Sequence, residues 1–300
     1  MLKIAYNENY VQPLPEGHRF PMEKYDLLPK QLCYEGTVDE QAFFNPSIIE
    51  EQWVTQVHDK NYFQRLVNLE LSPKEQRKSG FPHDERLIKR ELMIMEGTRQ
   101  CAAFALEYGV AMNIAGGTHH AFTNRAEGFC LLNDIAIAAK WLLSQGKAAK
   151  ILVIDLDVHQ GNGTAEIFKN ESNVFTFSMH GKNNYPLHKE KSDLDVELED
   201  GIQDNDYLYL LEKHLDKLFN SFQPDFIFFQ SGVDIINTDK LGRLGVTING
   251  CKERDKIVLS LAKQNKIPIV ASMGGGYSPE IKHIIEAHAN TFRTAQYIYF

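Results

Sequence analysis

Short apolar runs recur along the chain, separated by stretches in which apolar residues have helical spacing. The apolar runs cover residues 110–115, 150–156, 173–179, 225–230 and 267–272. Continuous apolar character over this length is typical of strands buried on both faces of a parallel sheet. The helical stretches cover 84–108, 134–145, 206–220, 251–265 and 279–296. This alternation predicts an α/β fold, a parallel sheet flanked by helices on both faces.

Local signals refine the expected element ends. Ser72-Pro73-Lys74-Glu75 has the pattern of a capping box, which predicts a short helix there. Ser278-Pro279-Glu280 predicts that the last helix begins with Ser278 as its N-cap. The first 80 or so residues are rich in proline and are expected to form loops and short elements. No internal repeat or linker interrupts the chain, so we expect a single domain over residues 1–300.

Composition excludes several classes of protein. The chain has 300 residues, of which 43% are hydrophobic, which argues against a disordered protein. Its net charge of −8 argues against direct nucleic-acid binding. No apolar run approaches the ~20 residues that span a bilayer, and the N-terminus lacks the apolar core of a signal peptide. The four cysteines show no paired spacing, so we expect reduced thiols in a cytoplasmic protein.

The unusual polar motifs all follow predicted strands. They are residues 116–120 (GGTHH), 155–159 (DLDVH), 178–180 (SMH), Asp234 and 274–277 (GGGY). The carboxyl ends of parallel strands lie along one rim of a sheet, where ligands bind in such folds. The sequence therefore predicts one functional site built from five strand ends.

Asp157, His159 and Asp234 are the candidate metal ligands. In a strand, residues 155, 157 and 159 would share one face. Three protein ligands with mixed oxygen and nitrogen donors are typical of a catalytic zinc site, and Fe²⁺ suits them too. Asp155 is expected to orient a histidine rather than to bind the metal. Alone, the DLDVH segment would also suit a capping and hydrogen-bonding turn; the combination on one rim favours the metal.

The adjacent pair His119 and His120 suits acid–base chemistry near neutral pH, with Asp155 and Asn162 as candidate partners. Packing in the core is the alternative for an isolated histidine. Tyr277 follows a run of glycines and can donate a hydrogen bond to a carbonyl oxygen that gains negative charge. An ordinary turn with a packed tyrosine is the alternative there.

The motifs together resemble those of the zinc-dependent histone deacetylases. GGTHHA (116–121), GFCLLND (128–134), DLDVHQGNGT (155–164), SGVD (231–234) and GGGY (274–277) occur in that family's order and spacing. The resemblance runs from about residue 18 to about residue 295. It is strongest to the class IV branch and its bacterial relatives, through HQGN (159–162) and residues 81–90.

This resemblance implies a role for each matching residue and a fold of the arginase/deacetylase type. Asp157, His159 and Asp234 match the zinc ligands, and Tyr277 matches the tyrosine that polarises the carbonyl. The matched acid–base pair is His119, backed by Asp155, and His120, backed by Asn162. The residues matching the substrate channel are Phe129, Tyr185, Gly128 and Gly275. A monovalent cation, usually potassium in the family, would be held by Asp155, Asp157, His159, Ser178 and Met179.

Some positions depart from the family pattern. Asn162 stands where class I enzymes have an aspartate, and Tyr185 replaces the more usual phenylalanine. No match for the rim aspartate that grips the substrate backbone is present near residues 80–82. Since class IV relatives are associated with long fatty-acyl groups, acetyl need not be the preferred acyl group.

The resulting expectation is a zinc-dependent amidohydrolase that acts on acyl-lysine in a protein or peptide, or on a small N-acyl amine. An acylpolyamine amidohydrolase is one alternative. A ureohydrolase with two manganese ions is another, although Gln160 and Gly161 follow His159 and apolar residues flank Asp234. A non-catalytic acyl-lysine binder is the third. The sequence does not indicate an oligomeric state.

Overall fold

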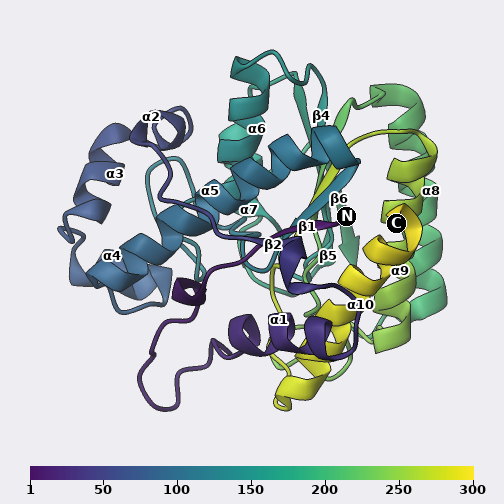
Figure 1. The fold of residues 1–300 in the computed structure, drawn as a ribbon, viewed down its shortest axis with the longest axis horizontal. Coiled ribbons are helices and arrows are strands. Elements are labelled where there is room, and N and C mark those ends of the chain that lie inside the picture. Colours follow the sequence, from purple (N-terminus) through teal and green to yellow (C-terminus); the bar gives the residue numbers. More distant parts are fainter.

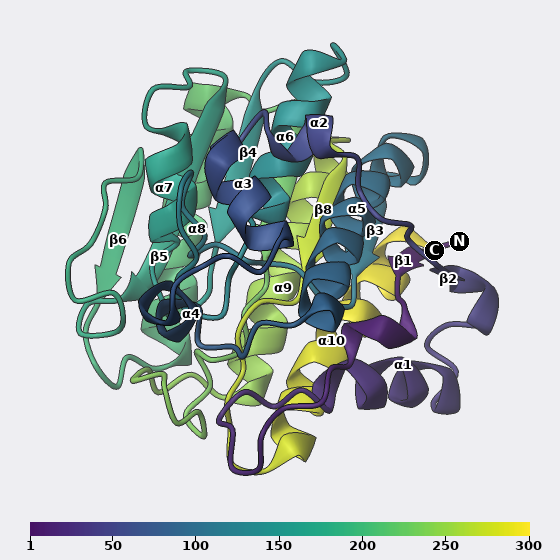
Figure 2. The same cartoon turned by 90° about the vertical axis from the view of Figure 1, so that its left-hand side faces the viewer.

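Eight parallel strands form one central sheet in the computed structural model, which describes residues 1–300. The spatial order of the strands is β2-β1-β3-β8-β7-β4-β5-β6. Their bounds are β1 Lys3–Ala5, β2 Phe43–Phe44, β3 Val110–Asn113, β4 Ile151–Asp155, β5 Val174–Gly181, β6 Leu194–Leu198, β7 Phe226–Gln230 and β8 Ile269–Ser272. Figure 2 shows β6 at one edge and β1 with β2 at the other. The central strands β3, β8, β7 and β4 are fully buried, as their apolar runs predict.

Helices cover both faces of the sheet (Figure 1). One layer contains α5 (Glu85–Tyr108), α6 (Asp134–Ser144) and α7 (Asn162–Phe168). The other contains α1 (Lys24–Tyr34), α8 (Asp204–Phe222), α9 (Ile248–Gln264) and α10 (Ile281–Tyr299). Three short helices lie outside the first layer, namely α2 (Glu51–Val54), α3 (Lys60–Val67) and α4 (Pro73–Ser79). The predicted fold class, a single α/β domain with a helix-flanked parallel sheet, is confirmed.

The ends of two predicted helices test the capping signals. Ser72 and Glu75 form both hydrogen bonds of a capping box at the start of α4, as expected. The prediction of Ser278 as N-cap of the last helix is wrong, because α10 begins at Ile281 and Glu280 is its N-cap. The Ser278 hydroxyl is instead hydrogen-bonded to the Thr238 hydroxyl, 2.9 Å away, and so contributes to a contact between two loops.

The order of the strands places the motif loops side by side. Strands β3, β8, β7 and β4 are adjacent and parallel, so the loops that follow them leave the same edge of the sheet. No helix of the structure combines the length and the apolar character needed to cross a membrane.

Candidate active site

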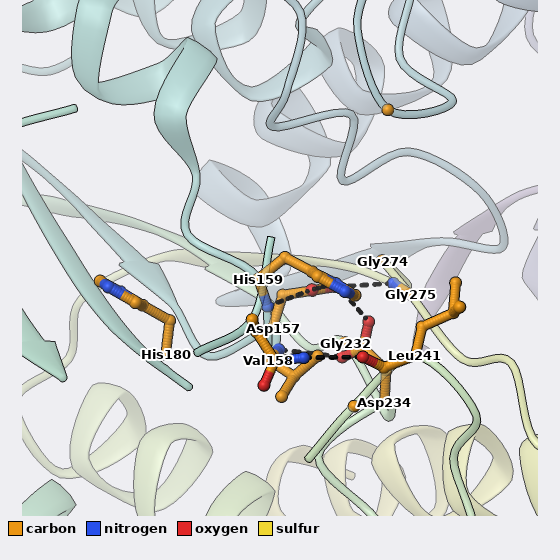
Figure 3. A network of polar contacts seen from close by, with 12 residues as sticks. Asp157, Val158, His159, His180, Gly232, Asp234, Leu241, Gly274 and Gly275 are labelled. Atoms are coloured by element: carbon orange, nitrogen blue, oxygen red, sulfur yellow. Dashed lines mark hydrogen bonds and ion pairs between the residues drawn. The ribbon is translucent and has the colours of Figure 1, made fainter. Parts of the chain in front are cut away.

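Asp157, His159 and Asp234 come together at the carboxyl edge of the sheet (Figure 3). His159 Nδ1 lies 3.0 Å from Asp157 Oδ1 and 3.1 Å from Asp234 Oδ2, and all three side chains are buried. One ligand atom from each residue lies within 4.8 Å of the others. The route to this arrangement differs from the expectation, because β4 ends at Asp155. Residues 157 and 159 therefore belong to the following loop rather than to one face of a strand.

Backbone groups hold the two carboxylates in place. The Gly275 N–H donates to Asp157 Oδ2 at 2.8 Å, and the Val158 N–H donates to Asp234 Oδ1 at 2.9 Å. Gly275 lies so close that a Cβ there would be 2.0 Å from Asp234 Oδ2 and 2.8 Å from Asp157 Oδ2. The predicted channel residue Gly275 thus lies against the candidate ligands, and only glycine fits beside them.

The charge of this cluster favours a cation. Burial, together with the neighbouring carboxylate of Asp157, raises the pKa of Asp234 to about 7. Burial opposes the charge of His159, but its hydrogen bonds to Asp157 and Asp234 outweigh this and raise its pKa to about 10. Two buried carboxylates and an imidazole nitrogen offer the mixed donors that zinc accepts in catalytic sites. These residues therefore fit a single divalent metal ion.

A buried guanidinium supports the loops that carry the ligands. Arg254 of α9 is fully buried and forms an ion pair with Asp255 at 2.7 Å. Its side chain also donates to the carbonyl oxygens of Leu156, Ser231 and Gly232, at 3.3, 3.3 and 2.5 Å. Carbonyl groups of both ligand-bearing loops thus share one cationic partner. Sequence reasoning missed this residue, because a single arginine in a helix carries no motif.

His119 and His120 lie beside the metal-ligand cluster, and each has the partner that the sequence predicts. His119 Nδ1 is 2.7 Å from Asp155 Oδ2, and His120 Nδ1 is 2.6 Å from Asn162 Oδ1. The two imidazole rings are 4.0 Å apart between centroids. An amide oxygen only accepts, so Asn162 fixes the proton of His120 on Nδ1 and leaves Nε2 free in the neutral ring.

The two histidines are placed in opposite charge states. Burial disfavours a charge on His119, but Asp155 and Asp157 outweigh it and raise its pKa to about 9. Burial lowers the pKa of His120 well below its ordinary value, and the charges of His119 and His159 lower it further. Near neutral pH the pair therefore offers one charged and one neutral imidazole, which is what acid–base catalysis requires.

The loop that carries the histidines is held by a glycine pair within it and by Asp134 and Gln230, to which the sequence analysis assigned no role in the site. Gly116 and Gly117 have positive φ values of 81° and 73°, which lets the chain turn sharply after β3. Asp134 at the start of α6 accepts hydrogen bonds from the N–H groups of Gly117 and Thr118, at 3.0 and 2.8 Å. Gln230 of β7 donates to the Gly117 carbonyl at 2.8 Å. The presence of Asp134 in the motif GFCLLND could have indicated this role, but the sequence analysis used Asp134 only as the first residue of a helix.

Tyr277 lies near the same cluster, its ring centroid 6.4 Å from that of His159. Desolvation raises the pKa of its phenol well above the ordinary value, and Asp234 and Asp157 add to this, so the group stays protonated. Asp239 accepts a hydrogen bond from the Tyr277 N–H at 2.5 Å. Lys24 lies behind the loop, with Nζ donating to the Gly274 carbonyl at 3.0 Å, and burial lowers its pKa to about 8. Sequence reasoning missed both Asp239 and Lys24.

A cavity of about 300 Å³ leads from the surface to His120 and His159. The predicted channel residues Phe129, Tyr185 and Gly128 line it together with Tyr277. The Tyr185 ring lies 5.0 Å from that of His120, and the Phe129 ring lies 6.0 Å from that of Tyr277. The structure thus brings all four channel candidates, counting Gly275, to one place.

The residues predicted to hold a monovalent cation lie on neighbouring strands. Ser178 of β5 is the register partner of Asp155 of β4, and both Ser178 and Met179 are buried. The Ser178 hydroxyl is hydrogen-bonded to His180 Nδ1 at 2.9 Å. His180 itself points away from the metal-ligand cluster (Figure 3).

Several proteins are similar to this chain in sequence, in fold or in both. The family model of the histone deacetylase domain matches residues 18–292. An uncharacterised protein of Picosynechococcus is 41% identical over 296 residues, covering 99% of each chain. Histone deacetylase 2 of Arabidopsis thaliana is 28% identical over 302 residues, covering 95% of this chain and 76% of its own length. The crystal structure of a histone deacetylase homologue from Aquifex aeolicus superposes with a TM-score of 0.84 at 24% identity, over 98% of this chain and 84% of its own. The chain belongs to the histone deacetylase domain family.

Proposed function

We propose that the chain is a zinc-dependent hydrolase that removes an acyl group, acetyl or longer, from N-acyl-lysine or a related N-acyl amine. The observation that carries this proposal is the convergence of one three-ligand metal cluster, a histidine pair and a tyrosine at the inner end of an aromatic-walled cavity. Each of these parts has a separate task in amide hydrolysis, and none is needed for binding alone. This favours an enzyme over a non-catalytic acyl-lysine binder.

A zinc ion held by Asp157, His159 and Asp234 supplies Lewis acidity, which activates water and polarises a carbonyl group at neutral pH. The protein's own side chains then handle the protons. His120, neutral and with Nε2 free, takes the proton of the attacking water. His119, kept charged by Asp155, donates a proton to the leaving amine. The Tyr277 phenol donates a hydrogen bond to the oxygen that gains negative charge.

The donor set supports one metal ion rather than two. Asp157, His159 and Asp234 form the one group of three or more histidine, cysteine or carboxylate side chains whose ligand atoms all lie within 4.8 Å of one another. A ureohydrolase with two manganese ions needs further carboxylates to bridge the second ion, and the neighbours of Asp234 in sequence are Val233 and Ile235. The geometry therefore favours mononuclear amide hydrolysis.

Three finer assignments belong to the same proposal. We place the chain in the class IV branch, on the motifs HQGN (159–162) and residues 81–90. We propose that potassium binds near Asp155, Asp157, His159, Ser178 and Met179, supported by the pairing of Ser178 with Asp155. We also propose a cytoplasmic location, since all four cysteines are free thiols.

Lysine peptides that carry acyl groups from acetyl to myristoyl test the proposal directly. We expect hydrolysis of at least one member of the series by the zinc-loaded protein, and a preference that reports the acyl length. Tyr277→Phe removes only the phenolic hydroxyl and should lower kcat by about 100-fold, as the loss of one oxyanion donor does elsewhere. Pure protein with one zinc ion per chain that hydrolyses none of these peptides and no small N-acyl amine, such as an N-acetylated polyamine, would refute the proposed function.

A further inference from the structure

Three basic side chains surround the mouth of the cavity that leads to His120, namely Arg19, Lys78 and Arg243. All three are exposed, and no carboxylate contributes to the lining of this cavity. Arg243 forms an ion pair with Asp200 at 3.4 Å, but both groups are exposed, so this ion pair is weak. The mouth is thus positively charged, although the whole chain carries a net charge of −8.

Glu127 and Glu75, two carboxylates close in sequence to lining residues of the cavity, have partners other than the three cations of the mouth. Glu127 accepts a hydrogen bond from the Tyr185 hydroxyl and pairs with Arg125 at 3.3 Å. Glu75 pairs with Arg65 at 2.6 Å and also closes the capping box of α4. The cations at the mouth therefore remain available to a ligand.

The three cations are distributed over two walls of the cavity. The Arg19 guanidinium lies 5.1 Å from the centroid of the Phe129 ring, and the Lys78 carbonyl accepts a hydrogen bond from the Gly128 N–H at 3.1 Å. Both residues therefore belong to the wall that contains Phe129. Arg243 belongs to the loop that follows β7, where the Leu241 carbonyl accepts a hydrogen bond from Asn184, the neighbour of Tyr185. An acyl-lysine that enters between these walls has basic groups on more than one side of its backbone.

We propose that the substrate is an acyl-lysine within an acidic peptide segment, with aspartate or glutamate on both sides of the acylated lysine. This inference rests on the proposed function and specifies its substrate class. Opposite charges around the mouth attract such a segment and disfavour basic ones. A free acyl-lysine offers only one carboxylate to three separated cations. An N-acylpolyamine offers no carboxylate, and its positively charged amines would be repelled by the basic side chains of the mouth.

Matched peptides provide the test. They carry the acyl group that is hydrolysed fastest in the series above, and the residues flanking the lysine are all glutamate, all glutamine or all lysine. We expect kcat/KM for the glutamate peptide to exceed that for the lysine peptide by about tenfold at low salt, since three exposed contacts each contribute a few-fold at most. Near 1 M salt, where the Debye length falls to about 3 Å, the ratio should approach one.

Variants assign the preference to the three residues. The triple variant R19Q/K78Q/R243Q should bring the ratio of glutamate to lysine peptide close to one. Lys74 and Arg77 are exposed and lie in α4, as Lys78 does, but they do not line the cavity. The double variant K74Q/R77Q is therefore the control and should leave the ratio unchanged. Equal kcat/KM values for the glutamate and lysine peptides, or a triple variant that keeps the preference, would overturn the inference.

Binding separates this inference from the proposed function. Fluorescence anisotropy with the same peptides and the His120→Ala variant reports affinity without turnover. Tighter binding of the glutamate peptide supports the charge selection even if no peptide is hydrolysed, in which case only the proposed reaction fails. Equal binding of the glutamate and lysine peptides overturns the selection, whether or not the peptides are hydrolysed.

Discussion

Replacing Gly275 by alanine places a methyl group at the metal-ligand cluster without changing any ligand. The new Cβ would lie 2.0 Å from Asp234 Oδ2, whereas separations below 3.0 Å essentially never occur. The carboxylate must therefore retreat by about 1 Å, and Asp157 Oδ2, 2.8 Å away, is crowded as well. Metal sites tolerate changes of only about 0.2 Å in ligand distance. We expect zinc affinity to fall by about 100-fold or more, together with a loss of about 1–3 kcal/mol in stability from overpacking.

Zinc affinity is measured by competition with a chelator, and the metal content of the dialysed protein is determined by mass spectrometry. Gly146→Ala is the matched control, because its Cβ meets no atom within 4 Å while its φ of +60° makes alanine unfavourable. The control should lose about 1–2 kcal/mol of stability and keep its zinc. A Gly275→Ala protein that binds one zinc ion per chain as tightly as the wild type would refute the geometric argument.

Further predictions concern catalysis, stability and metal binding. His120→Ala should abolish turnover and keep one zinc ion per chain, and near-normal turnover would remove His120 from the scheme. Arg254→Leu leaves Asp255 buried without its partner, so the free energy of unfolding in urea should fall by about 3 kcal/mol, and an unchanged value would contradict this role. Hydrogen bonds from Arg293 lower the pKa of Glu35 to about 2, so the pair stabilises the fold above pH 4.5 and this contribution declines as the pH falls toward 2. Because this pair is partly exposed, Glu35→Gln should lower the free energy of unfolding by about 0.5–1 kcal/mol at pH 7 and by less at pH 4. An equal loss at both pH values would contradict the linkage. Chelation of divalent ions should lower Tm in the wild type but not in Asp234→Ala, and equal shifts would place the stabilising ion elsewhere.

The strands that could be predicted from the sequence are those in which nearly every residue is buried. Strands such as β4 and β7 are buried along their whole length, and their apolar runs identify them directly. The sequence reading missed β1, β2 and β6, because they are two to five residues long and partly exposed, so their pattern is not continuous. It also missed α7, whose sequence NGTAEIF begins with poor helix formers inside a motif that was interpreted for its chemistry.

For the site, the partners of the histidines could be predicted, because Asp155 and Asn162 lie in the same motif as the candidate metal ligands. The supports could not be predicted. Lys24 and Arg254 reach the site from helices α1 and α9, far away in sequence, and neither stands in a recognisable pattern. The cations of the cavity mouth, such as Arg19 and Arg243, are also separated by most of the chain. Only the folded structure brings such residues together.

The order of the strands also has a consequence for how the protein acquires its site during synthesis. Strands β3 and β4 follow one another along the chain, yet β8 and β7 separate them in the sheet. The centre of the sheet is therefore incomplete until β8, Ile269–Ser272, has left the ribosome. High contact order of this kind slows folding and leaves strand edges exposed in the nascent chain. A polypeptide that stops before Ile269 would thus lack Tyr277 and β8, the strand that pairs with both β3 and β7. We expect such a polypeptide to depend on chaperones.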